Sequence, residues 1–293
     1  MNNKDLKKVV ESALDKQKVP HVKLKKIGAS KVDVASLTEP SKETRQEYWG
    51  KGLTYCAIIL IIILVASIIG FIGFHGLETF TKDDVNVFQF FTSSDWDPGE
   101  GKNHVGAAAM IVTSFSVTLL AALVATPFAI AVALFMTEYS SKKGARFLQS
   151  VIELLVGIPS VVYGFLGLTV IVPFIRNIFG GTGFGILSAT LVLFVMVLPT
   201  ITSLTVDSLK AVPSDYRKAS LALGATKWQT IYKVILRVAS PRIMTAVIFG
   251  MARAFGEALA VQMVIGNAVL MPANLVSPSA TLTSQLTSQM GNT

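Results

Sequence analysis

Five long apolar segments constrain the fold of this chain more than any other feature of its sequence. The first, Gly52–Gly73, has 22 residues and would form roughly 33 Å of α-helix at about 1.5 Å per residue. A helix of that length crosses the hydrocarbon core of a bilayer, which is about 30 Å thick. The other four segments are Val105–Thr137, Phe147–Ile175, Gly183–Val206 and Ile243–Ile265. The pattern predicts an all-α polytopic membrane protein with five spans, because lipid cannot satisfy exposed backbone polar groups.

The composition excludes an ordinary soluble domain. Hydrophobic residues make up 52% of the 293 residues and charged residues only 15%, whereas soluble domains carry about 25% charged residues. The single cysteine, Cys56, rules out an internal disulfide framework and a cysteine-based metal cluster. The net charge of +8 would suggest nucleic-acid binding in a soluble protein. In a membrane protein such an excess is a topology signal instead.

Lysine and arginine lie mainly on one side of the predicted membrane. The segment before the first span contains 12 of them, the turn at 138–146 contains 3 and the loop at 207–242 contains 7. The opposite side has Lys82, Lys102 and Arg176. The positive-inside rule therefore places the N-terminus and the long loop in the cytoplasm and makes the chain a multi-pass protein of the cell membrane. This distribution explains the basic charge through membrane lipid and topology, without nucleic acid.

Residues 1–47 form a basic cytoplasmic tail, and residues 48–293 form the membrane domain. The tail has no long apolar run, so it is not a secretory signal. Four of its apolar residues recur at helical spacing between lysines, which allows a short amphipathic helix lying on anionic lipid. The alternative is a solvated tail without stable structure.

The loop at 207–242 has its own helical signals. Tyr216–Leu223 reads as two helical turns, and Gly224 supplies a left-handed stop. Thr226 can cap a second helix over Lys227–Val238. A short helix between two spans is suited to docking with a peripheral protein. It could equally lie on lipid headgroups through its lysines and arginines.

This loop resembles the cytoplasmic signature of ABC importer permeases. That signature reads Glu-Ala-Ala, three residues, Gly, nine residues and Ile-x-Leu-Pro. The residues that match it, valine being a conservative change, are Ala219, Gly224, Val234 and Leu236. The residues that depart from it are Lys218, Ser220 and Arg237.

Two further stretches narrow the resemblance. Residues 153–164 and 252–267 are similar to the third and fifth spans of the phosphate-specific (Pst) importer permeases. The ending Met-Val-Ile-Gly-Asn is nearer the PstC-type subunit than its PstA-type partner. The resemblance covers the chain from Tyr48 to Thr293. The resembling permeases carry a sixth span, which is missing here at the C-terminus, through truncation or absence of that helix.

The resemblance implies a type I ABC importer transmembrane domain that moves inorganic phosphate inward. Its partners would be a second permease (PstA-type), a dimeric ATPase (PstB-type) and an extracytoplasmic phosphate-binding protein (PstS-type). The ATPase-coupling interface would fall on Tyr216, Ala219, Ser220, Leu223 and Gly224. The chain has no Gly-x-x-x-x-Gly-Lys-Ser/Thr sequence that could cradle ATP phosphates. We therefore expect it to bind no cofactor, with ATP and Mg²⁺ used by the partner ATPase.

Two charged residues lie inside the predicted fifth span. Arg253 and Glu257 are four residues apart, which would put them on one helical face. Charged residues at membrane depth usually face protein or a water-filled cavity. Arg253 could offer its guanidinium to a passing phosphate, with Glu257 holding the arginine and moderating the affinity for the anion. The alternative is mutual neutralisation that only makes the span insertable.

A third candidate contact lies in the predicted third span. The segment Gly157-Ile-Pro-Ser160 is expected to bend the helix or to line a cavity, and Ser160 could donate to phosphate. Ordinary packing of a kinked helix would give the same pattern.

No nucleophile–base pair, carboxylate dyad or metal-ligand cluster is apparent, so the sequence indicates a transport subunit and not an enzyme. Two alternatives stay open: a permease for another oxyanion, such as sulfate or molybdate, and a membrane regulatory subunit that reports phosphate status to a sensor protein.

Overall fold

The computed structural model describes residues 42–82, 85–97 and 104–290. The amphipathic pattern predicted near the N-terminus lies outside these residues. The chain divides into two compact units, Met1–Gly73 and Phe74–Thr293, which are described separately. Helix α3 (Lys42–Thr81) begins in the first unit, and its 40 residues extend the first predicted span at both ends.

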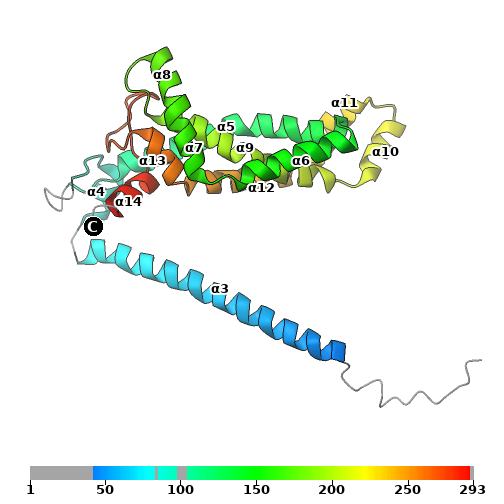
Figure 1. Cartoon of the computed structure of the whole chain (residues 1–293), viewed down its shortest axis with the longest axis horizontal. Helices are drawn as coiled ribbons and strands as arrows, with labels where there is room; N and C mark the ends of the chain where they lie inside the picture. Colours follow the sequence, from blue (N-terminus) through cyan, green and yellow to red (C-terminus); the bar gives the residue numbers. More distant parts are fainter. Residues whose placement is uncertain (1–41, 83–84, 98–103, 291–293) are drawn as a thin grey trace, which may run out of the picture. The chain divides into compact units, whose positions relative to one another are not determined.

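The second unit is a bundle of helices (Figure 1). Its candidate membrane spans are α5 (Ala108–Leu134) with the π-helical turn η1 (Phe135–Tyr139), α7 (Ser160–Leu166) with η2 (Gly167–Ile171) and α8 (Val172–Phe179), α9 (Ile186–Lys210), and α11 (Lys227–Thr230) with η3 (Ile231–Ile235) and α12 (Leu236–Phe255). Helix α6 (Lys142–Gly157) lies between the first two of these in sequence. Its shorter helices are α4 (Val87–Thr92), α10 (Ser214–Ala222), α13 (Leu259–Ile265) and α14 (Leu282–Met290).

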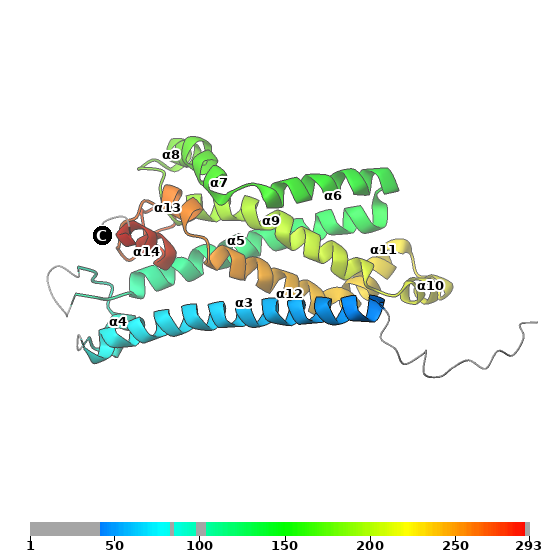
Figure 2. The ribbon, with the colours of Figure 1, turned by 60° about the horizontal axis from the view of Figure 1, so that its bottom comes forward.

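The long helices α5, α6, α9 and α12 run side by side, and the short helices gather at their ends. Helices α10 and α11 lie at one end of the bundle, and α4, α13 and α14 lie at the other (Figures 1 and 2). We refer to these as the α10 end and the α14 end. The polar loop that was predicted to be a docking element therefore projects from one end of the membrane helices.

Helix α9 forms the centre of the bundle. Its side chains Leu193, Met196 and Ile201 are almost completely buried. Helix α5 faces this core with alanines at four-residue spacing, Ala121, Ala125 and Ala129, all with 0% exposure. Small residues allow helix backbones to approach closely, and in lipid close packing replaces the hydrophobic drive for association. The alanine stripe thus serves packing.

Five helical segments of the described chain are long and apolar enough to cross a membrane, as predicted. The third begins later than expected, at Ser160 and not at Phe147. Ile158 is extended (φ −69°, ψ 129°) because the proline that follows disfavours helical backbone at the residue before it. The preceding helix α6 carries lysine, arginine and glutamate among its apolar residues and forms a separate, less apolar element. The predicted bend at Gly157–Ser160 is confirmed.

The fifth span is also shifted relative to its prediction. It covers Lys227–Phe255, so the second loop helix continues into the membrane helix through η3. The helix stops at Phe255, ten residues before the predicted end at Ile265, and α13 starts only at Leu259. The intervening residues include Gly256, a poor helix former, and Glu257, whose carboxylate binds the start of α13.

Candidate functional site

Arg253 lies in the last turn of α12 and is half-buried. Its Nη1 atom donates a 2.6 Å hydrogen bond to Oγ1 of Thr200 on the central helix α9. Thr200 is itself only 7% exposed. Tyr163 of α7, on a neighbouring part of the bundle, donates its hydroxyl hydrogen to the carbonyl of Leu155 at 2.8 Å. The guanidinium is therefore bonded to the central helix of the bundle.

Glu257 does not share a helical face with Arg253, and this part of the prediction is wrong. Helix α12 ends before Glu257, so the four-residue spacing has no helical geometry behind it. The carboxylate of Glu257 accepts a 3.2 Å hydrogen bond from the backbone N–H of Ala260, and its carbonyl accepts one of 2.8 Å from Thr283 of α14. No ion pair joins Glu257 to Arg253 in the described part of the chain.

The carboxylate of Glu257 instead borders a small polar cavity with a volume of about 10 Å³. That volume is close to the space that one water molecule needs. Hydroxyl groups make up much of its lining, from Ser114, Thr118, Thr281 and Thr283. Through its two hydrogen bonds Glu257 joins the start of α13 to α14 at the α14 end of the bundle.

Ser160 is the first residue of α7, directly after the proline bend, and is half-buried. Ser160 and Tyr163 are three residues apart, so both hydroxyl residues lie on one face of the first turn after the bend. The structure places Ser160 directly after an interruption of the helical backbone, as the sequence indicated. Its contact with phosphate stays a prediction.

Helix α10 exposes most of the residues predicted to meet an ATPase. The exposed fractions of Tyr216 and Leu223 are 48% and 88%, and Ala219 is also exposed. Gly224 adopts φ +79°, the left-handed stop that was predicted. Ser220 differs, because its hydroxyl lies 2.9 Å from that of Thr230 on α11 and holds the two short helices together.

Sequence reasoning missed three apolar side chains on the same end of the bundle. Leu221 is 52% exposed, and Trp228 and Tyr232 are 63% and 62% exposed. The two rings stack, with centroids 6.5 Å apart and planes within 10°. Their four-residue spacing on a predicted helix was a usable signal.

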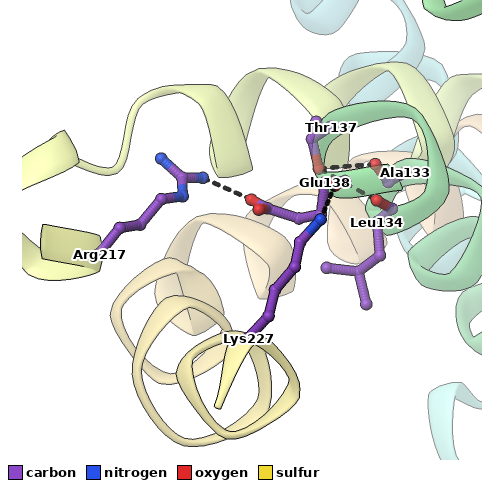
Figure 3. Close-up of polar contacts among 6 residues, drawn as sticks. All are labelled: Ala133, Leu134, Thr137, Glu138, Arg217 and Lys227. Carbon is purple, nitrogen blue, oxygen red and sulfur yellow. Dashed lines mark hydrogen bonds and ion pairs between the residues drawn. The ribbon is translucent and has the colours of Figure 1, made fainter. Parts of the chain in front are cut away.

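A second missed feature fastens α10 to the second span. Arg217 of α10 forms a 2.6 Å ion pair with Glu138 of η1, and the glutamate side chain is only 10% exposed (Figure 3). The Nζ atom of Lys227 donates to the backbone carbonyl of Glu138 and lies 4.5 Å from the ring centroid of Tyr139. The two partners of Glu138 are 79 and 89 residues away in sequence, so no local sequence pattern predicts these contacts.

Residues 125–290 match the family described as the binding-protein-dependent transport system inner membrane component. The chain belongs to this permease family. The permease is 51% identical over 257 residues to the probable ABC transporter permease protein YqgH of Bacillus subtilis, covering 86% of this chain and 83% of that protein. It is 31% identical to the phosphate transport system permease protein PstC of Xylella fastidiosa, with 85% and 82% covered.

A solved inward-facing structure of the MetNI methionine ABC transporter covers 64% of the permease and 79% of its own chain, at 25% identity and a TM-score of 0.47. Family membership and five apolar helices make the permease a multi-pass membrane protein and a transport subunit. The all-α fold class expected from the sequence is confirmed. The family's own description ties such permeases to a substrate-binding protein.

Proposed function

We propose that the permease translocates inorganic phosphate across the cytoplasmic membrane as one subunit of an ATP-driven ABC importer. The observation that carries this proposal is the guanidinium of Arg253, which lies in the last turn of a candidate membrane helix and is bonded to a buried hydroxyl, Thr200. Relatives named as phosphate transport permeases, at 30–33% identity over most of the chain, support phosphate as the substrate.

A guanidinium has five N–H donors in a planar fork that matches two oxygens of a phosphate. Thr200 accepts from one of them in Arg253, so the bond orients the fork and leaves further donors for an anion. Ser160, the first residue of α7, would add a hydroxyl group along the path. Such neutral donors bind an oxyanion without holding it too tightly for release.

Glu257 takes a different part in this proposal from the one expected. Its carboxylate and carbonyl fix the interruption at residues 256–258, directly after the turn that carries Arg253. We propose that Glu257 contributes to the substrate pathway by holding this bend, while Thr200 orients the guanidinium.

The α10 end of the bundle would face the cytoplasm, in agreement with the positive-inside distribution of lysine and arginine. There the exposed side chains Tyr216, Ala219 and Leu223 would dock with a dimeric PstB-type ATPase that binds ATP and Mg²⁺. Ser220 and Gly224 would shape the interface from within, through the bond to Thr230 and the left-handed stop. A PstA-type second permease and a PstS-type phosphate-binding protein would complete the importer.

The test is uptake of radiolabelled phosphate into vesicles that contain the assembled complex. Arg253→Ala should abolish uptake while the complex still co-purifies, and Arg242→Ala, an exposed arginine on the same helix, provides the matched control. Normal uptake by the Arg253 variant would overturn the role of this residue. Sulfate and molybdate are tested as competitors beside excess unlabelled phosphate. If either inhibits uptake more strongly than phosphate does, the substrate is that oxyanion and not phosphate.

A further inference from the structure

The carboxylate of Glu138 is an unusual group for the end of a membrane span. It lies in the π-helical turn η1 that terminates the second span, and only 10% of its side chain is exposed. A buried carboxylate is tolerated when a cation compensates it, and the loss of one partner leaves an uncompensated charge. Arg217 supplies that cation at 2.6 Å and comes from α10, the proposed ATPase-docking helix.

The backbone of the same residue has a second link. A helix leaves its last carbonyls without intrahelical partners, and cations near that end are favoured. Lys227 of α11 uses this site by donating an Nζ hydrogen to the carbonyl of Glu138 (Figure 3). Its Nζ atom also lies over the ring of Tyr139. One cationic side chain of the docking helix α10, Arg217, and one of α11, Lys227, therefore meet at one residue of η1.

Helix α10 has few other attachments. None of its residues is buried, and the ion pair of Lys218 with Asp215 stays within the helix on its exposed face. Apart from the hydroxyl contact between Ser220 and Thr230, the polar side-chain link from α10 to a membrane helix in the described chain is Arg217 to Glu138. A displacement of α10 by a bound ATPase would therefore reach the second span through this ion pair.

Helix α5, which η1 continues, packs against the central helix α9 through its alanine stripe. Helix α9 carries Thr200, the partner of Arg253. Single π-helical turns are frequent at functional sites, and two of them flank the link, η1 at Glu138 and η3 directly after α11. Contiguous packed elements thus lead from α10 to the proposed substrate contact.

We propose that Glu138 is a positioning residue that transmits the movement of α10 to the membrane helices through its ion pair with Arg217, with Lys227 as a second tether. The proposal rests on the proposed function, because it assigns α10 to ATPase docking. It concerns coupling between the α10 end of the bundle and the membrane helices, and it is independent of which anion is carried.

The experiment uses the assembled importer and a readout that needs no substrate. In a Cys56→Ala background, Thr245→Cys places a thiol in the groove between α9 and α12. The labelling rate with a maleimide is compared with and without ATP plus vanadate. Glu138→Gln and Arg217→Ala should each reduce the nucleotide-dependent change in rate by about tenfold, within the range typical of coupling between sites. Lys218→Ala, next to Arg217 but exposed, should leave it unchanged.

The charge-exchanged variant Glu138→Arg with Arg217→Glu separates coupling from folding. It should restore most of the nucleotide-dependent change, because the ion pair is re-formed with reversed polarity. The proposal would be overturned if the single variants show the same nucleotide-dependent labelling as the parent. It would also be overturned if the exchanged variant labels or assembles no better than the single variants. A parent complex whose labelling ignores nucleotide would overturn it too. A parent that responds to nucleotide without taking up phosphate would overturn only the proposed substrate.

Discussion

Arg253 on α12 and Thr200 on α9 are joined by a 2.6 Å hydrogen bond across the centre of the bundle. Thr200 follows Pro199, which lies inside α9 and cannot donate a backbone hydrogen bond there. Thr200 is 7% exposed, so its bond to the guanidinium forms largely away from solvent. Within the described residues, this pair fixes an arginine near the end of a candidate membrane helix without a carboxylate partner.

Replacing Thr200 with valine should lower phosphate uptake while the complex still assembles. The variant keeps the shape of the side chain but removes the acceptor that orients Arg253. A hydrogen bond to a charged group contributes about 1.5–3 kcal/mol, which corresponds to roughly 10- to 100-fold in uptake rate. Thr200→Ser keeps the hydroxyl and should retain most of the uptake. If the valine variant transports like the parent, Arg253 does not depend on Thr200.

Gly224 should be required for ATPase docking more than for folding. Its φ of +79° lies in the left-handed region, and a Cβ there would meet no other atoms, so the cost of Gly224→Ala is backbone strain alone. A strain of about 1 kcal/mol is expected for a non-glycine residue in this conformation. Co-purification with the ATPase should weaken in the alanine variant and recover in Gly224→Asn, since asparagine tolerates this region better. Equal binding by both variants would contradict the prediction.

Much of the architecture could be predicted from the sequence because its signals are local. Apolar length gave the five spans, Pro159 gave the bend and Gly224 gave the stop after α10. The end of α12 could not be predicted, because Phe255 to Ala258 reads as a continuous apolar helix containing one carboxylate. The interruption depends on Thr283, which binds the carbonyl of Glu257 from 26 residues away.

The candidate site was predictable only in part for the same reason. An arginine inside an apolar segment is visible in the sequence, but its partner Thr200 is one of many threonines in the spans and is 53 residues distant. The pair of Glu138 and Arg217 is separated by 79 residues. Contacts of this kind follow from the packing of helices, which a single sequence does not specify.

Gly250 should be sensitive to the smallest enlargement. A Cβ at this position would lie 2.5 Å from Cγ1 of Ile201, whose side chain is completely buried. Gly250→Ala should therefore destabilise the purified protein by about 1–3 kcal/mol, as overpacked cores do. Gly52→Ala, where a Cβ meets nothing, should have little effect. Thermal unfolding in detergent measures both, and recovery of stability in Gly250→Ala with Ile201→Val would identify the contact. An unchanged midpoint in Gly250→Ala would show that α12 and α9 can separate at little cost.

Variants of Glu257 should show whether this residue is a charge partner of Arg253 or a structural hydrogen-bond acceptor. If Glu257 neutralised Arg253, Glu257→Gln would remove the charge and abolish uptake. The structure instead has the carboxylate accepting from the N–H of Ala260 at 3.2 Å, which a glutamine oxygen can also do. We therefore expect Glu257→Gln to retain uptake within about threefold, whereas Glu257→Ala, which leaves the start of α13 uncapped, should lose about 1 kcal/mol of stability. Uptake and thermal unfolding, measured on the same preparations, check both effects. Loss of uptake in the glutamine variant with unchanged stability would restore the ion-pair hypothesis.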